Sequence, residues 1–260
     1  MLADAVPVVD LNMCVSNVVP STLPVSVRPT NINSVPLSPK MELLHQILRS
    51  KLVTPVKVDR LESLLFGYPI SLKKFLVSGF SHGFRVSFIG ERHAFESPNL
   101  KSALAQPDIV TSKINNERAA GRIVGPFNSP PFPLFRCSPL GIVPKKDPSE
   151  FRLIHHLSYP QGSSVNDCIP AEFSSVHYAS INDTISIIKK TGPCCFMAKT
   201  DVKSAFRIMP IHPNDYDLLG MKWQNLYYFD RCLSMGCSSL VLHLNGSPGI
   251  VSELWACYIF

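Results

Sequence analysis

The sequence predicts an α+β fold, and three observations support this prediction. Between residues 39 and 121, apolar residues recur at the spacing of amphipathic helices. Later segments instead alternate between apolar and polar residues, as strands do, and two pairs of them are joined by short turns typical of β-hairpins. The chain also contains 23 prolines in 260 residues. Because proline removes a backbone donor and clashes inside helices, a helical bundle or coiled coil is excluded.

The composition is that of a folded chain. Apolar residues make up 45% of the sequence and charged residues 17%, which rules out wholesale disorder. The formal net charge is +6 at pH 7. This charge permits an anionic partner without requiring one, since nucleic-acid-binding domains are usually more basic.

Targeting signals and cysteine usage favour an intracellular protein, with cytoplasm and nucleus both left open. No apolar run approaches the roughly 18–20 residues that span a bilayer. The first basic residue is Arg28, so the start lacks the positive region of a signal peptide. The eight cysteines show no CxxC pair and no framework spacing, from which we expect reduced thiols. Together these observations predict no secretion and no transmembrane segment.

We expect four regions along the chain. Residues 1–38 have little periodicity and are predicted to form a flexible, proline-rich lead-in. A helical N-terminal region covers 39–121, and a region of hairpins covers 122–239. A divergent tail covers 240–260, where glycine and proline lie close together and argue against a continuous helix.

The helical region is predicted to hold five helices and one strand. The first begins at Pro39, with Ser38 as its capping residue, because proline suits the first helical position. The expected starts of the others are Val58, the residue after a capping Ser71, Asn99 and Asp108. A short strand is predicted through Phe84, Val86 and Phe88.

In the region 122–239 the strands dominate. Strands at 139–143 and 151–157 form a hairpin with a basic tip, and strands at 218–223 and 226–230 form a second hairpin. Between them we expect a helix marked by isoleucines and closed by a glycine, then a buried strand over 195–200.

Charged residues at two of these places suggest phosphate chemistry. Asp201 ends the buried strand, where a carboxylate can bind Mg²⁺ or simply cap the next turn. At the first hairpin, Arg152 alternates with apolar neighbours and leaves the opposite face of its strand. Together with Lys145 and Lys146 it could form a basic flap over a phosphate-bearing ligand, the alternative being a solvated hairpin tip.

Three segments in order resemble the fingers hairpin, motif A and motif B of reverse transcriptases. They read SPLGIVPKKDPSEFR, FMAKTDVKSAFRIMPIHP and YYFDRCLSMGCSS. The preceding stretch NLKSALAQPDIV…ERAAGRIVGPFNSPPF is similar to the lead-in of DIRS-type retroelements, those that carry a tyrosine recombinase. The resemblance covers roughly residues 60–239 and implies the fingers and the first half of the palm of a right-hand polymerase.

The resemblance implies roles for the acidic and basic residues. Asp201 corresponds to the catalytic, metal-binding aspartate of motif A, and the main-chain carbonyl of Val202 to a further ligand of Mg²⁺. Lys145 and Arg152 correspond to the residues that grip the incoming triphosphate, whereas Lys146 is a weaker match.

The resemblance also implies roles for three apolar positions. Phe206 corresponds to the aromatic gate beneath the sugar of the incoming nucleotide. Met235 and Gly236 correspond to the turn of motif B, where many relatives have Gln-Gly. The methionine and the preceding Ser234, which stands where proline is common, depart from the usual contacts of motif B, whereas the glycine of its turn is kept.

The implied activity is RNA-directed DNA synthesis on a primed RNA or DNA template from deoxynucleoside triphosphates, with Mg²⁺. Two metal ions are needed for this reaction, and one aspartate cannot hold both. The chain contains no Asp-Asp pair of the kind that motif C supplies, and Glu253 is the only acid after Asp230. We therefore expect an inactive reverse transcriptase segment, truncated after motif B by a frameshift or splice error near Ser239.

Other interpretations stay open. The chain could be a non-catalytic nucleic-acid-binding remnant, an unstable pseudogene product, or an RNA-synthesising polymerase, although the apolar Phe206 argues against the last of these. The adjacent His155 and His156 resemble a metal site, but neighbouring strand residues face opposite sides. The sequence indicates no oligomeric state.

Overall fold

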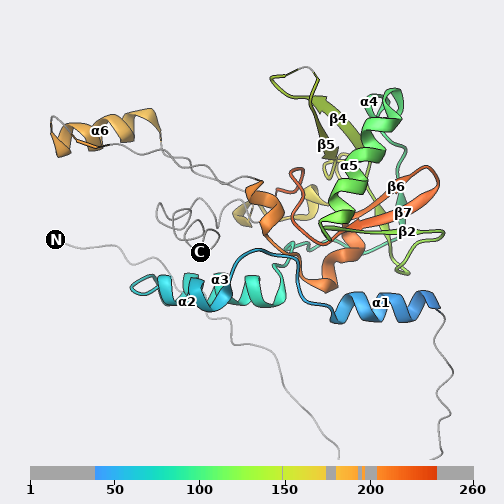
Figure 1. The fold of residues 1–260 in the computed structure, drawn as a ribbon, viewed down its shortest axis with the longest axis horizontal. Coiled ribbons are helices and arrows are strands. Elements are labelled where there is room, and N and C mark those ends of the chain that lie inside the picture. Colours follow the sequence, from blue (N-terminus) through green and yellow to red (C-terminus); the bar gives the residue numbers. More distant parts are fainter. Residues whose placement is uncertain (1–38, 148, 174–179, 193–194, 197–203, 239–260) are drawn as a thin grey trace, which may run out of the picture. The chain divides into compact units, whose positions relative to one another are not determined.

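The structure, a computed structural model, describes residues 39–147, 149–173, 180–192, 195–196 and 204–238. All of them belong to the second of two units, Pro39–Phe260. Helices and strands both occur along this unit and the main sheet is mixed, so the predicted α+β class is confirmed (Figure 1). The predicted lead-in, 1–38, and the predicted tail, 240–260, lie outside the described residues.

The described part of the chain contains six α-helices at the places that the apolar spacing predicts. They are α1 (Pro39–Arg49), α2 (Val58–Leu64), α3 (Ile70–His82), α4 (Lys101–Ala105), α5 (Pro107–Ala119) and α6 (Ile181–Thr191). The prediction that Ser71 caps the third helix is wrong. Pro69, in an extended conformation, leads directly into α3, which begins at Ile70, so Ser71 lies inside the first turn.

The prediction of a strand through Phe84, Val86 and Phe88 is also wrong. Phe84 forms only an isolated bridge with Ile211. The Val86 amide donates to the Asp215 carboxylate at 2.9 Å, and Ser87 adopts a φ of 59°, so the backbone leaves the extended conformation. Phe84 and Val86 are nevertheless buried. The alternation correctly indicated which side chains are buried, but not how the backbone pairs.

The main sheet has five strands in the order β1-β3-β6-β7-β2. Their bounds are β1 (Phe95–Glu96), β2 (Ile123–Phe127), β3 (Arg136–Cys137), β6 (Gly220–Trp223) and β7 (Leu226–Asp230). The first three in this order are parallel, and β7 is antiparallel to both of its neighbours. Gln224 and Asn225 both adopt positive φ in the β6–β7 turn, as a two-residue hairpin of this type requires.

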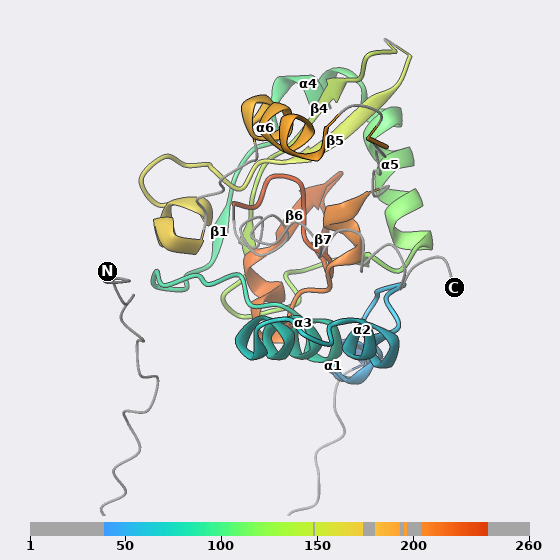
Figure 2. The ribbon, with the colours of Figure 1, turned by 90° about the vertical axis from the view of Figure 1, so that its left-hand side faces the viewer.

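The predicted basic hairpin is confirmed as a separate two-stranded sheet of β4 (Leu140–Pro144) and β5 (Phe151–His155). The strands are antiparallel, with Val143 opposite Arg152 and Pro144 opposite Phe151. Helix α5 packs against β5 and β2, and α4 packs against β4 (Figure 2). The hairpin is therefore held from one side by two helices.

Two apolar cores stabilise this arrangement. In the first, α2 and α3 pack against residues 206–219 and the buried Phe229 of β7. In the second, Val110 and Ile114 of α5 pack against Leu140 of β4 and Trp223 of β6. Because the second core joins α5 to both sheets, it determines the distance between the basic hairpin and the end of β7.

The buried strand predicted over 195–200 falls largely outside the described residues. Cys195 and Phe196 are described, and they form neither helix nor strand. The side chain of Phe196 is fully exposed.

Candidate functional site

A cleft of about 320 Å³ lies between α5, the basic hairpin and the ends of β6 and β7. We call it the hairpin cleft. Three of the residues singled out from the sequence, Lys145, Arg152 and Met235, contribute to its wall. The other lining residues are Lys113, Asn116, Glu117, Ile123, Leu140, Phe151, Leu153, His155, Ser204, Arg207, Met221, Asp230 and Ser234.

The strand pairing of the hairpin places its two cations at the cleft. Phe151 and Leu153 pack against the second core, whereas Arg152 between them is exposed, as the alternation predicts. The Arg152 backbone pairs with Val143 of β4, whereas its guanidinium makes no hydrogen bond or ion pair with any other described residue. Lys145 follows β4, and its ammonium lies 2.7 Å from the Glu150 carboxylate. Lys146 is exposed at the tip and is not among the lining residues.

Met235 and Gly236 form a turn that lies against the end of the hairpin. The Met235 side chain is half exposed and lines the cleft. A Cβ atom on Gly236 would lie only 2.0 Å from the carbonyl oxygen of His155. Glycine is thus required here, because the turn approaches the backbone of β5 more closely than any side chain permits.

Asn166 fixes this turn and was not anticipated from the sequence. Its Nδ2 donates to the Gly236 carbonyl at 2.7 Å, and its Oδ1 accepts from the Ser238 amide at 2.9 Å. A lone asparagine at the start of a 3-10 turn, Asn166–Cys168, carries no pattern that would have identified its distant partners.

The residues assigned to motif A are only partly described. Asp201 and Val202 lie outside the described residues. Phe206 belongs to a 3-10 turn, Ala205–Ile208, and packs partly buried against the first core. It is not among the residues that line the hairpin cleft, so its role as a gate stays a prediction.

A buried ion network forms the inner wall of the cleft. Arg207 donates to Glu117 of α5 at 2.8 and 2.9 Å and to Asp230 of β7 at 2.7 Å. It also donates to the Leu233 carbonyl at 3.4 Å. Glu117 in turn accepts two hydrogen bonds from Arg122. One guanidinium thereby links the 3-10 turn Ala205–Ile208 with helix α5 and with the residues just before the turn at Met235 and Gly236.

The network keeps its carboxylates ionised. Burial opposes ionisation of Asp230, yet the charge of Arg207 holds the pKa of this carboxyl below its usual value. Burial likewise opposes ionisation of Glu117, whose pKa is lowered by Arg122 and Arg207. Burial alone would lower the pKa of Arg207, but Asp230 and Glu117 raise it. The neighbouring Cys232 thiol, by contrast, stays protonated at neutral pH, because burial raises its pKa to about 12.

Two buried polar atoms on the cleft wall have no hydrogen-bond partner among the described residues. They are His155 Nδ1 and Ser234 Oγ. His155 Nε2 donates to the Gly220 carbonyl at 3.0 Å, and Nδ1 lies 3.4 Å from an Asp230 oxygen. His156 is only partly buried and follows the last residue of β5, so the two histidines are not neighbours on one strand as predicted.

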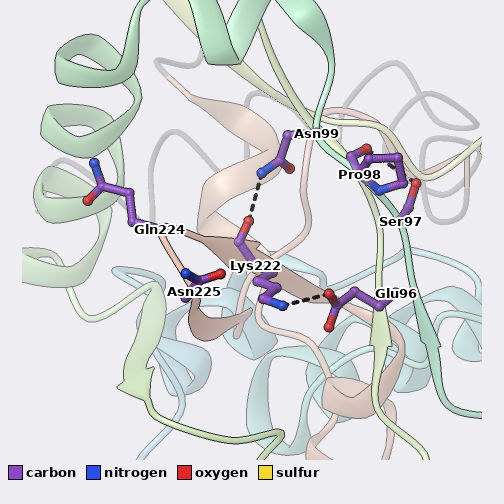
Figure 3. Close-up of a pocket in the computed structure, with 7 residues that line it drawn as sticks. All are labelled: Glu96, Ser97, Pro98, Asn99, Lys222, Gln224 and Asn225. Carbon is purple, nitrogen blue, oxygen red and sulfur yellow. Dashed lines mark hydrogen bonds and ion pairs between the residues drawn. The ribbon is translucent and has the colours of Figure 1, made fainter.

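A second hollow, of about 410 Å³, lies beside the β6–β7 turn (Figure 3). Its charges are already paired, because Lys222 Nζ lies 2.6 Å from the Glu96 carboxylate. Asn99 donates to the Lys222 carbonyl at 2.9 Å. None of the residues singled out from the sequence lines this hollow.

Over the described ranges, no group of three His, Cys, Asp or Glu side chains could bind a metal ion. The predicted Mg²⁺ ligands, Asp201 and Val202, lie outside the described residues. None of the described helices combines the length and apolar content that a membrane span needs.

Comparison with known proteins gives solved structures only. No family model and no curated protein matches the chain. The crystal structure of native prototype foamy virus protease-reverse transcriptase is 17% identical, with a TM-score of 0.40, over 77% of this chain and 25% of that one. The foamy viral protease-reverse transcriptase in complex with RNA/DNA hybrid is 12% identical, with a TM-score of 0.40, over 81% and 26%.

A third structure, the foamy viral protease-reverse transcriptase in complex with dsDNA, is 12% identical, with a TM-score of 0.40, over 72% of this chain and 40% of that one. The chain thus spans about a quarter of the length of the first of these structures. A likeness at this identity and TM-score does not by itself assign a function.

Proposed function

We propose that the chain carries the nucleotide-binding part of an RNA-directed DNA polymerase of a DIRS-type retroelement, comprising the fingers and the first half of the palm. The observation that supports this proposal is the hairpin cleft. Lys145 and Arg152 come from the segment that resembles the fingers motif, and Met235 from the segment that resembles motif B. These segments are far apart in the sequence, yet their residues line one cleft.

Each of these residues has a distinct function in the proposed site. Arg152 makes bidentate hydrogen bonds to the triphosphate, and Lys145 acts as a point charge beside it. Gly236 allows the motif B turn to approach the hairpin, so that both sides of the nucleotide are enclosed. Phe206 lies beneath the sugar and leaves no room for a 2′-hydroxyl, which favours deoxynucleotides over ribonucleotides.

Asp201, with the main-chain carbonyl of Val202, is proposed to hold Mg²⁺. The ion would offset the charge that develops on the transferred phosphoryl group. Asp201 is the proposed catalytic residue, and a primed RNA or DNA template and deoxynucleoside triphosphates are the proposed partners. An intracellular location in the cytoplasm or nucleus is part of the same proposal.

A second candidate, a nucleic-acid-binding protein without turnover, is favoured by one feature of the sequence. The 260 residues contain no Asp-Asp pair, so the second group of metal-binding carboxylates is missing from this chain. Phosphate contacts need only the basic groups. Salt-sensitive binding to a primed template is therefore compatible with both candidates.

Primer extension and nucleotide binding together test the proposal. We expect the purified chain to bind a deoxynucleoside triphosphate in the presence of Mg²⁺, and this binding to be lost in Arg152→Gln. We expect no template-dependent extension of a labelled primer above a heat-treated control. Extension above that control would refute the proposed inactivity. Nucleotide binding that does not depend on Arg152 would refute the proposed site.

A further inference from the structure

The basic tip of the hairpin contains its own competing anion. The Lys145 ammonium lies 2.7 Å from Glu150 Oε2, and the Lys145 amide donates to the Glu150 carbonyl at 2.7 Å. The pairing lowers the pKa of Glu150, so the carboxylate is ionised at neutral pH. Of the two hairpin cations that line the cleft, one is therefore already neutralised by a residue of the same turn.

A third cation faces the hairpin from α5. Lys113 lines the cleft together with Lys145 and Arg152. Its positive charge also contributes to lowering the pKa of Glu150, which places the two groups within electrostatic reach of each other. Lys113 lies in α5, outside the three segments that resemble the polymerase motifs, and no pattern in the sequence singles it out.

Within the described part of the chain, Asp147, the acidic residue at the tip of the hairpin, contacts a serine and not a lysine. Asp147 accepts hydrogen bonds from the Ser149 amide at 2.9 Å and from the Ser149 hydroxyl at 2.7 Å. It orders the turn without contacting a cation in these bonds. Glu150 and Asp147 thus carry the same charge in one short turn, but only Glu150 pairs with Lys145.

We propose that Lys113, Lys145 and Arg152 bind one polyphosphate across the hairpin cleft, and that Glu150 is the carboxylate which this ligand displaces from Lys145. The proposal rests on the cleft being the nucleotide site of the proposed function. A polyphosphate carries several negative charges and can contact all three cations, whereas Glu150 contacts one. Exchange of Glu150 for the ligand requires only a side-chain rotation, because both groups of the ion pair are partly exposed.

The size of the effect follows from the exposure of the pair. Exposed ion pairs contribute little, so removing the competitor should strengthen polyphosphate binding by about two- to fivefold. Removing one of three cations that contact the ligand directly should weaken binding by about tenfold or more, because a hydrogen bond to a charged group is lost.

The test measures the binding of tripolyphosphate, and separately of a deoxynucleoside triphosphate, to the full chain by isothermal titration calorimetry. Glu150→Gln should bind both ligands more tightly than the unmodified chain. Its matched control, Asp147→Asn, removes the same charge from the same turn and should change the affinity less. Lys113→Gln should weaken binding, whereas Lys101→Gln, on the neighbouring helix α4 and outside the cleft, should not.

A double substitution isolates the contact from general electrostatics. In a Lys145→Gln background, Glu150→Gln should no longer strengthen binding, because there is no ammonium left to release. An equal gain in both backgrounds, or an equal gain from Asp147→Asn, would overturn the role of Glu150. An unchanged affinity in Lys113→Gln would overturn the proposed contact between Lys113 and the polyphosphate.

The two ligands distinguish failure of the proposed polymerase function from failure of the polyphosphate site. If tripolyphosphate binds and obeys these relations while the deoxynucleoside triphosphate does not bind, the polyphosphate site stands and the polymerase proposal fails. If neither ligand binds to the unmodified chain or to Glu150→Gln, both proposals fail.

Discussion

Asp215 shows how a single buried carboxylate organises a long segment of the chain. It is almost fully buried, in the 3-10 turn Pro213–Leu218. It accepts hydrogen bonds from both Arg85 and Arg92 and from the Val86 amide. Burial opposes its ionisation, but the hydrogen bonds from Arg85 and the Val86 amide hold its pKa below the usual value. This residue thereby fixes the stretch after α3 that the sequence alone misassigns as a strand.

Replacing Asp215 with asparagine should destabilise the fold. Asn keeps the size of the side chain but loses the charge, and hydrogen bonds to a charged group are worth about 1.5–3 kcal/mol each. We expect the free energy of unfolding in urea to fall by at least about 1.5 kcal/mol. Asp147→Asn, at the exposed hairpin tip, should change the free energy of unfolding much less. Equal effects of the two substitutions would contradict the assigned role.

Gly236 provides a second test at the scale of one residue. In Gly236→Ala the new methyl group would meet the His155 carbonyl oxygen, which belongs to the backbone and not to a flexible side chain. Overpacking of this kind costs about 1–3 kcal/mol, so the urea midpoint should fall. Met235→Ala removes a half-exposed side chain and should have less effect on the midpoint. An unchanged urea midpoint in Gly236→Ala would contradict the close approach of the turn to the backbone of β5.

At the scale of elements, the sequence could predict the hairpins because their signals are local. Alternation around Arg152 identifies the exposed face of β5, and Gln224-Asn225 identifies the turn between β6 and β7. The ion network could not be predicted in the same way. Arg207 meets Glu117 across 90 positions of the chain, and nothing in the sequence near either residue indicates the other.

A double-mutant cycle tests this network. Arg207→Met would leave the fully buried Asp230 without its strongest cation, and breaking a buried ion pair in this way costs about 3–5 kcal/mol. Adding Asp230→Leu removes the uncompensated charge, so the double variant should lose less stability than the two single variants combined. Unfolding free energies from urea denaturation provide the measurement. Strictly additive losses would show that the two side chains do not stabilise one another.

At the scale of the whole molecule, the buried carboxylates predict how stability depends on pH. Asp215, Asp230 and Glu117 all have pKa values in the folded chain below their usual ones. Folding therefore favours their ionised forms. Their contribution is fully present above the unfolded values of about 4, and is lost as the pH falls through the lower folded values.

The urea midpoint should accordingly decrease most steeply below about pH 4. Between pH 7 and about pH 5 it should decrease only slightly, because burial lowers the pKa of His212 and protonation of this group opposes folding. Asp215→Asn removes one of the three groups, so its midpoint should decrease less steeply over the same range. A midpoint that rises on acidification would contradict the ionised network.

In the proposed site, the basic hairpin and the turn at Met235 and Gly236 bind the same nucleotide. The most direct test is photo-crosslinking of the full chain with a deoxyadenosine triphosphate analogue that carries an aryl azide on its γ-phosphate, followed by peptide mapping. We predict adducts within residues 140–155 and 232–238, competed by unlabelled deoxyadenosine triphosphate and lost in Arg152→Gln. Adducts confined to other peptides, such as those around Lys222, or labelling that persists in Arg152→Gln, would contradict the proposed site.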